Sequence, residues 1–277
     1  MSVQVMKGKA SEADSILSAV QRGRHDIPYF SDYFLGRRLH DKQAEWITNA
    51  VATINVLATA NRWGKTAVQP VGHFHAGFYK TGAEPFYVNE HGEVDLDKFA
   101  KVRYETVHLG GEWETSRLVW DDAHKILQES TALAPFIQDK PRTLPPHITG
   151  INGFRWKFRT LGHDSRGVDG NSFYLVTVDE AGWIDGLEEM MQNVLRVRIA
   201  DVKGRIWIVG TFKPGVSRDF YKYAVRAAAH TGVALSFDHR SDGDTSTGEA
   251  ADLDGTIKAY LKEFGINLDE YREAIGG

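Results

Sequence analysis

The sequence predicts an α/β fold in which a mainly parallel sheet is sandwiched between helices. Short apolar runs rich in β-branched residues alternate along the chain with segments of helical periodicity, the order typical of βαβ units. Three of these runs lead directly into short polar or glycine-containing loops, at 59–66, 179–182 and 210–215. Because ligands bind at the carboxyl ends of parallel strands, we expect these three loops to meet at one edge of the sheet.

The composition is that of an ordinary globular protein. The 277 residues, 42% hydrophobic and 25% charged, suffice for one large α/β domain or two small ones. The absence of cysteine excludes disulfides, thiolate metal sites and cysteine nucleophiles. No apolar run is long enough for a membrane span, and no apolar segment follows the first lysines, so we expect neither a membrane protein nor a secretory signal. A net charge of −4 excludes a globally basic nucleic-acid binder.

Periodicity predicts the individual elements. Helices are expected at 11–22, 41–52 (with Asp41 as its N-cap), 114–128, 187–197, after Ser217 and at 253–275. Strands are expected at 54–58, 102–109, 148–151, 154–160, 173–178 and 205–209. The stretch around Pro28 is interpreted as turns, and residues 81–100 as an excursion from the core.

The octet at 59–66 fits the phosphate-binding pattern G-x-x-x-x-G-K-[ST] except at its first position. It consists of Thr59, Ala60, Asn61, Arg62, Trp63, Gly64, Lys65 and Thr66. In such a loop, backbone N–H groups converge on an anion at a helix N-terminus. Lys65 would reach the β- and γ-phosphates of ATP, and the Thr66 hydroxyl would bind Mg²⁺. For a lone Gly-Lys-Thr the alternative is a solvated turn. Pro70 predicts an irregular helix after the loop.

Two adjacent acids follow a second apolar strand. Residues 174–178 lead straight into Asp179 and Glu180. Asp179 would hold Mg²⁺ at the strand end, and Glu180 would act as general base toward the attacking water. The alternative is a strand that ends in solvated acids.

Two further residues complete a candidate nucleotide set. Thr211 follows the strand at 205–209, where its hydroxyl would sense the γ-phosphate. Gln43 lies on the helix before the octet, and its amide can donate to and accept from the edge of adenine. The alternative for Thr211 is an ordinary strand–turn residue, and the alternative for Gln43 is a solvated helix residue.

Arginines are the candidates for stabilising charge on a transferring phosphoryl group. Arg62 would act within its own chain, and Arg166, on a glycine-rich loop, would act on a neighbouring subunit; Arg196 and Arg198 are further options. Residues 155–159 alternate basic and aromatic side chains. We interpret them as a half-buried strand with a solvated basic face, with a DNA platform as the alternative. His73 and His75 do not share a helix face, so no metal pair is expected there.

In this order, the four motifs resemble the ATPase domain of the large terminase subunit of tailed bacteriophages, over about residues 39–223. The octet is similar to one branch of that family, in which the first glycine is often absent and an arginine lies inside the loop. Gln43 matches the adenine-side glutamine, and Asp179 and Glu180 match the metal-binding and catalytic acids. The coupling motif is similar to 210–215, although Phe212 departs from the usual small residue or proline. Arg166-Gly167 matches an Arg-Gly pair of many members.

The resemblance implies a P-loop NTPase domain of the RecA/ASCE-like class. It implies a Mg²⁺-dependent ATPase that drives double-stranded DNA into a procapsid in the host cytoplasm. The implied partners are the portal protein and the small terminase subunit, with a homo-oligomeric ring on the capsid, a monomer in isolation as the open alternative, and no membrane. The expected division is an N-terminal helical segment at 1–38, an ATPase core at 39–250 and a C-terminal helical segment at 251–277. We expect no nuclease domain, and hence no nuclease activity, in this chain.

Two other functions compete with this one. Asp179-Glu180-Ala181-Gly182 also resembles the acidic box of superfamily-two helicase-like translocases, which need a second core domain. A nucleotide-binding scaffold without turnover is the other alternative, and the presence of Glu180 argues against it.

Overall fold

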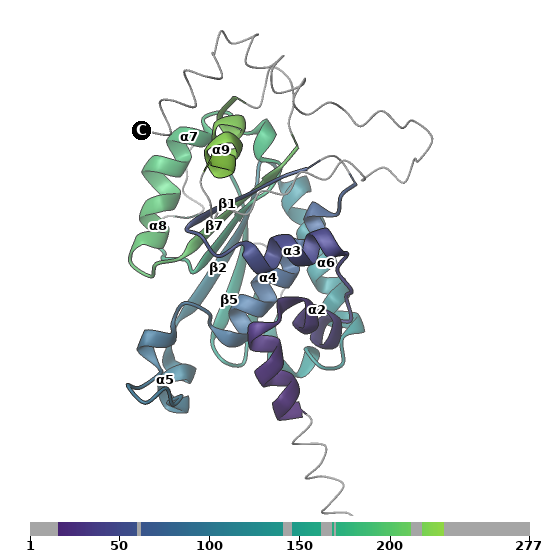
Figure 1. Cartoon of the computed structure of the whole chain (residues 1–277), viewed down its shortest axis with the longest axis vertical. Coiled ribbons are helices and arrows are strands. Elements are labelled where there is room, and N and C mark those ends of the chain that lie inside the picture. The colour runs from purple at the N-terminus through teal and green to yellow at the C-terminus, as the bar shows by residue number, and fades with distance from the viewer. Residues whose placement is uncertain are drawn as a thin grey trace, which may run out of the picture.

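The computed structural model describes residues 16–59, 62–140, 146–161, 168, 170–211 and 218–229. Its centre is a seven-stranded sheet in the order β1-β7-β6-β2-β5-β4-β3 (Figure 1). The strands are β1 (Ile54–Ala58), β2 (Tyr104–Gly110), β3 (Ile137–Asp139), β4 (His147–Gly150), β5 (Phe154–Thr160), β6 (Leu175–Val178) and β7 (Arg205–Gly210). The first five strands of this order pair in parallel, while β4 and β3 continue the sheet antiparallel. The predicted α/β class is confirmed.

Helices cover both faces of the sheet. The main ones are residues 16–25, α2 (Ile27–Leu35), α3 (Asp41–Asn49), α4 (Lys65–Tyr79), α5 (Leu96–Lys101), α6 (Trp113–Glu129), α7 (Leu187–Met190), α8 (Arg196–Ala200) and α9 (Arg218–Ala229). A π-helical turn, η4 (Met191–Leu195), joins α7 to α8, where one regular helix was predicted. Short 3₁₀ turns are η1 (Glu84–Phe86), η2 (Ala134–Phe136) and η3 (Ala181–Trp183). Among the residues that the structure describes, no helix is long and apolar enough to cross a membrane.

Alternation along the strands divides the core into two apolar layers. On β7, Trp207 and Val209 belong to the cluster that packs against α2, α3, α4 and α6. Ile206 and Ile208 face the other way, into the cluster formed with α7, α8 and α9. Since both faces are covered, the central strands are apolar almost throughout, as expected of buried parallel strands.

Helix α4 packs on the face of the sheet that it shares with α2, α3 and α6, and it continues unbroken through Pro70. The helix therefore does not break at this proline, although its first turn carries a bond from the N–H of Ala67 to the carbonyl of Gly64, three residues back, at 3.0 Å. Pro70 supplies no N–H to the carbonyl of Thr66, but every residue from Val68 to Gly77 is buried. Packing on all sides holds the helix where the isolated sequence would favour a break.

Two predictions at the N-terminal side are wrong. The stretch around Pro28 is helix α2, because proline is tolerated in a first helical turn, where its missing N–H has no partner to lose. Asp26 caps this helix by accepting a hydrogen bond from the backbone N–H of Tyr29 at 2.9 Å. Helix α3 is capped by His40 instead of Asp41, which is its first residue.

The excursion at 81–100 is anchored by a buried lysine. It carries η1 and α5 and lies at the opposite end of the sheet from the strands' carboxyl ends (Figure 1). Lys80 donates from Nζ to the carbonyls of Phe99 and Val102, at 2.5 and 2.7 Å. These bonds close the base of the excursion onto the end of α4.

A buried polar group links α4 to the sheet. The Thr177 hydroxyl of β6 lies 2.9 Å from His73 Nε2 on α4 and 2.9 Å from His108 Nδ1 on β2. None of the three side chains is exposed. Burial lowers the pKa of His108 to about 3 and lowers that of His73 well below its ordinary value, so both rings are neutral. His75 points elsewhere, toward the carbonyl of Gly23 at 3.1 Å, as the helical spacing predicted.

These histidines predict a pH-dependent stability. Their pKa values are lower in the folded chain than in the unfolded one, so the unfolded state binds more protons below about pH 6.5. The stability that the two neutral histidines contribute is complete above that pH and is lost as the pH falls, for His108 until about pH 3. Each contributes a slope of up to about 1.4 kcal/mol per pH unit. In His108→Leu one contribution is absent, so urea unfolding between pH 7 and 5 should show a smaller pH slope than in the wild type. Equal slopes would contradict this account.

Candidate nucleotide site

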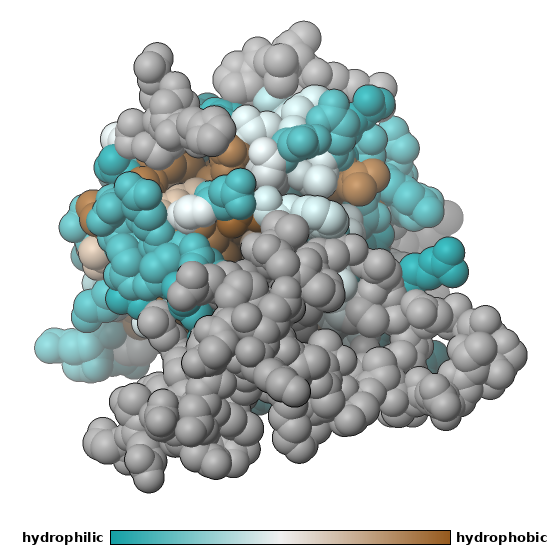
Figure 2. All heavy atoms as spheres, turned by 90° about the horizontal axis from the view of Figure 1, so that it is seen from above, coloured by the Kyte–Doolittle hydropathy of each residue, from teal (hydrophilic) through white to brown (hydrophobic). Residues whose placement is uncertain are grey.

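The strand ends that lead into the three predicted loops are neighbours at the carboxyl edge of the sheet. Strand β7 pairs with β1 on one side and with β6 on the other, which brings these ends side by side. The backbone N–H of Thr59 donates to the carbonyl of Gly210 at 3.2 Å, which joins the ends of β1 and β7. Seen from this edge, the described surface is largely hydrophilic, with a few apolar patches (Figure 2).

The octet forms a tight turn into α4. Gly64 is the N-cap and has a left-handed backbone, with φ 87°. This positive φ favours glycine, and a Cβ at Gly64 would lie 2.4 Å from Nε2 of Gln43, so a larger residue would also displace that side chain. Arg62 is exposed and is also left-handed, with φ 63°, a conformation that costs a non-glycine residue about 1–3 kcal/mol and that clusters at functional sites. Ala60 and Asn61 lie outside the described residues.

Lys65 is buried at the centre of the site. Its Nζ donates to Oγ1 of Thr211 at 2.8 Å and to the carbonyl of Thr59 at 3.4 Å. The ammonium therefore lies between the octet and the end of β7. A buried charge with polar partners is stable there and remains suited to bind an anion.

The paired acids continue β6. Asp179 is buried, and burial raises its pKa to about 6, against the opposing effects of Gln69 and Lys65. Its Oδ1 accepts a hydrogen bond from the backbone N–H of Glu180 at 2.9 Å. Glu180 is half-buried and left-handed, with φ 50° and ψ 38°, a second strained residue at this edge.

The arrangement suits Mg²⁺ bound together with phosphates. Among the described residues, no three His, Cys, Asp or Glu side chains form a group that could hold a metal. Mg²⁺ commonly takes only one or two carboxylates and completes its coordination with phosphate oxygens and water. Thr66, in the first turn of α4, and Asp179 are the side chains that would hold it.

The end of β7 packs directly on the turn after the acids. A Cβ at Gly210 would lie 3.1 Å from the backbone nitrogens of both Ala181 and Gly182, and 3.2 Å from the ring of Phe220. The end of β7 and the turn after the acids are therefore in close backbone contact.

The structure places Gln43 behind the octet. The side chain is buried, and its Nε2 donates to the carbonyls of Trp63 and Gly64, at 3.3 and 3.2 Å. Arg198 is not brought to the site, because its carbonyl bonds the N–H of Phe173, just before β6 begins. Arg166 lies outside the described residues.

Two residues near the site were missed from the sequence. Gln69 is fully buried next to Asp179, one helical turn after Lys65. His40 caps α3 and contacts the octet. The i, i+4 spacing from Lys65 was the available signal for Gln69, whereas nothing local marks His40.

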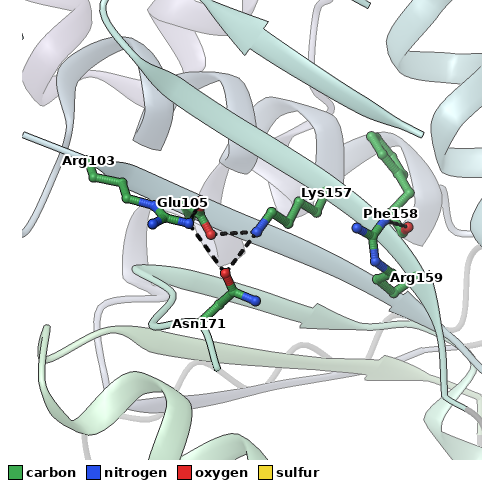
Figure 3. A network of polar contacts seen from close by, with 6 residues as sticks. All are labelled: Arg103, Glu105, Lys157, Phe158, Arg159 and Asn171. Atoms are coloured by element: carbon green, nitrogen blue, oxygen red, sulfur yellow. Dashed lines mark hydrogen bonds and ion pairs between the residues drawn. The ribbon is translucent and has the colours of Figure 1, made fainter. Parts of the chain in front are cut away.

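The alternation at 155–159 is confirmed, but its basic face is not simply solvated. Trp156 and Phe158 are buried in the layer that packs against α2, α3, α4 and α6. On the other face Lys157 is buried and donates to Glu105 at 2.6 Å, and Arg103 donates to the same carboxylate at 2.6 Å (Figure 3). Although burial opposes it, hydrogen bonds from Lys157 and Arg103 hold the pKa of Glu105 below its ordinary value. A buried carboxylate needs such partners.

Comparison with known proteins identifies the fold. No family model matches the chain, and no curated protein does. The large terminase ATPase domain of Thermus phage P74-26, in a mutant form, matches with a TM-score of 0.52 at 11% identity, over 76% of this chain and 84% of that one. The large terminases of bacteriophage HK97 and of a thermophilic bacteriophage match with TM-scores of 0.48 and 0.49 at 16% and 13% identity. These two matches cover 68% and 73% of this chain, but only 37% and 46% of those proteins.

The chain therefore has a P-loop NTPase fold. More particularly, it has the fold of the ATPase domain of a phage large terminase, as the motifs predicted.

The contact at Gly210 predicts a localised packing defect. Gly210→Ala would press a methyl group against the backbone of Ala181 and Gly182 and should lower the free energy of unfolding by about 1–3 kcal/mol. Gly111→Ala is the matched control, because a Cβ there meets only Ile184, at 3.9 Å. Chemical unfolding of both variants gives the comparison. A Gly210→Ala protein as stable as the wild type would refute the close contact.

Proposed function

We propose that this chain is the ATP-hydrolysing motor domain of a viral large terminase, which drives double-stranded DNA into a procapsid. The observation that carries the proposal is the 2.8 Å hydrogen bond between Lys65 Nζ and Thr211 Oγ1, with buried Asp179 on the adjoining strand. This bond joins a phosphate loop to the end of β7 at the edge where P-loop enzymes bind nucleotides. The fold shared with a large terminase ATPase domain supports the same conclusion.

In this proposal, the residues of the octet, from Thr59 through Ala60 and Asn61 to Thr66, surround the phosphates of ATP. Backbone N–H groups and the α4 N-terminus attract the anion. Lys65 exchanges its bond to Thr211 for the β- and γ-phosphate oxygens. Thr66 and Asp179 would hold Mg²⁺, which would supply positive charge to the phosphates.

Glu180 is proposed as the general base. It follows Asp179 directly, and its left-handed backbone sends its side chain in a direction that a regular strand would not allow. It would accept a proton from the water that attacks the γ-phosphorus. Arg62, exposed on the octet, would stabilise the transferring group within one chain, and Arg166 would do so across a ring of subunits.

Thr211 would report the state of the γ-phosphate. While Lys65 binds the phosphate, the hydrogen bond between Lys65 and the Thr211 hydroxyl is broken. It forms again when the phosphate leaves. Because Gly210 packs on the turn after Glu180, a shift at Thr211 would also move the acidic turn. This is the proposed link between hydrolysis and movement.

The wider assignments stay proposals. They include double-stranded DNA, the portal protein and the small terminase subunit as partners, a ring on the capsid, and a place of action in the host cytoplasm. The division at 1–38, 39–250 and 251–277 also stays a prediction, and 251–277 lies outside the described residues.

The acidic pair can be tested by steady-state ATPase assay with Mg²⁺, with and without double-stranded DNA. Glu180→Gln should lower kcat by about 10²–10⁴-fold, because the general base is lost while the shape is kept. Binding of ADP should be retained. Glu189→Gln is the control, because Glu189 is exposed on α7. Wild-type protein that binds ATP but never hydrolyses it would favour a scaffold, and unwinding stimulated by single-stranded nucleic acid would favour a helicase.

The arginines differ in how the rate depends on protein concentration. If Arg166 acts on a neighbouring subunit, the wild-type ATPase rate rises more than linearly with concentration, and Arg166→Ala removes that rise. Arg62→Ala should lower the rate equally at every concentration. An Arg166→Ala protein with an unchanged profile would exclude it as the trans-acting residue.

A further inference from the structure

The start of α3 is bonded to the octet by two side chains. His40 Nε2 lies 3.3 Å from the carbonyl of Trp63, and its ring meets the Trp63 ring edge-on at 5.0 Å between centroids. Gln43 Nε2 bonds the carbonyls of Trp63 and Gly64. Two successive peptide carbonyls of the octet therefore point at α3.

The hydrogen-bonding roles of both side chains are fixed by the cap of α3. The backbone N–H of Gln43 donates to His40 Nδ1 at 3.3 Å, so the hydrogen of a neutral ring lies on Nε2 and is donated to Trp63. The backbone N–H of His40 donates to Gln43 Oε1 at 3.1 Å, which leaves the two amide hydrogens of Gln43 for the octet. Both donors of that amide are therefore in use.

Peptide geometry relates these bonds to phosphate binding. In a planar trans peptide, the C=O and the following N–H point in opposite directions. Since the carbonyls of Trp63 and Gly64 point toward α3, the N–H groups of Gly64 and Lys65 point away from it. These N–H groups belong to the part of the octet that begins α4, where an anion binds.

We infer that His40 and Gln43 are positioning residues for the phosphate loop, and that Gln43 acts on the phosphates through the loop rather than by reading the base. This rests on the proposed nucleotide site and gives Gln43 a different role from the adenine contact expected by resemblance. Its consequence is specific: loss of either side chain weakens every polyphosphate ligand alike, whatever base it carries.

Two variants separate this role from helix capping. In His40→Ser, the serine still accepts from the N–H of Gln43, as a good N-cap does, but cannot reach Trp63. In Gln43→Glu, one carboxylate oxygen still accepts from His40, as in a capping box, but the other meets two carbonyls without a hydrogen to donate. Glu45→Gln, on the exposed side of α3, is the control.

The test measures binding of ATP, GTP and inorganic tripolyphosphate by calorimetry, with Mg²⁺ present, on the whole chain. Both variants should weaken all three ligands by about tenfold, from the loss of one or two hydrogen bonds, with an unchanged ratio of ATP to GTP affinity. Helical circular dichroism at the assay temperature should match the control, which shows that the variants are folded and α3 is still formed.

Two results would overturn the inference while leaving the proposed function intact. One is a Gln43→Glu protein that loses ATP affinity but keeps that for tripolyphosphate, which would show that the amide reads adenine. The other is unchanged binding of all three ligands by both variants. A wild-type protein that binds none of the three would overturn the proposed function and this inference together.

Discussion

The buried ammonium of Lys65 is the interaction on which the site depends. A charge in this position must have polar partners, and it finds them in Thr211 and in the carbonyl of Thr59. These partners belong to two different strand ends, so one side chain joins the octet to the end of β7. Because β7 lies between β1 and β6, the same bond sets the octet opposite Asp179. A ligand that binds the ammonium of Lys65 must therefore alter the hydrogen bonds that join the end of β1 to the end of β7.

Beneath this edge the molecule is tightly packed, and at the edge it is strained. Thr177, His73 and His108 join β6, α4 and β2 without any exposed surface. Above them, Arg62 and Glu180 have left-handed backbones, and Gly210 packs close to the acidic turn. Strain of this kind persists only where the surroundings hold it, and the buried layer supplies that support. The arrangement suits a site that must change shape in a few residues while the sheet stays fixed.

Away from the site, other buried charged or polar side chains also join distant segments by donating hydrogen bonds. Lys80 closes the base of the excursion by donating to two carbonyls, and Lys157 with Arg103 neutralises the buried carboxylate of Glu105. In both places a lysine that looks like a surface charge in the sequence is a buried tie between segments far apart in the chain. The cap of α3 belongs with them, since His40 and Gln43 bond a helix start to the octet twenty residues away.

The sequence by itself determined the α/β class, six of the seven described strands, the octet and the paired acids. Each rests on a local pattern: apolar runs predict strands, and the octet and Asp179-Glu180 follow strand ends directly. The short strand β3 and the order of the strands were not predicted. Local patterns were insufficient where tertiary packing decides. Pro70 stays inside an unbroken helix because its neighbours are buried, and the stretch around Pro28 is helical because Asp26 caps it and the core receives its apolar face. The direction in which the Gln43 side chain points and the ion pair of Lys157 with Glu105 depend on partners distant in sequence. No local spacing of residues predicts such partners. Only the tertiary structure could place them.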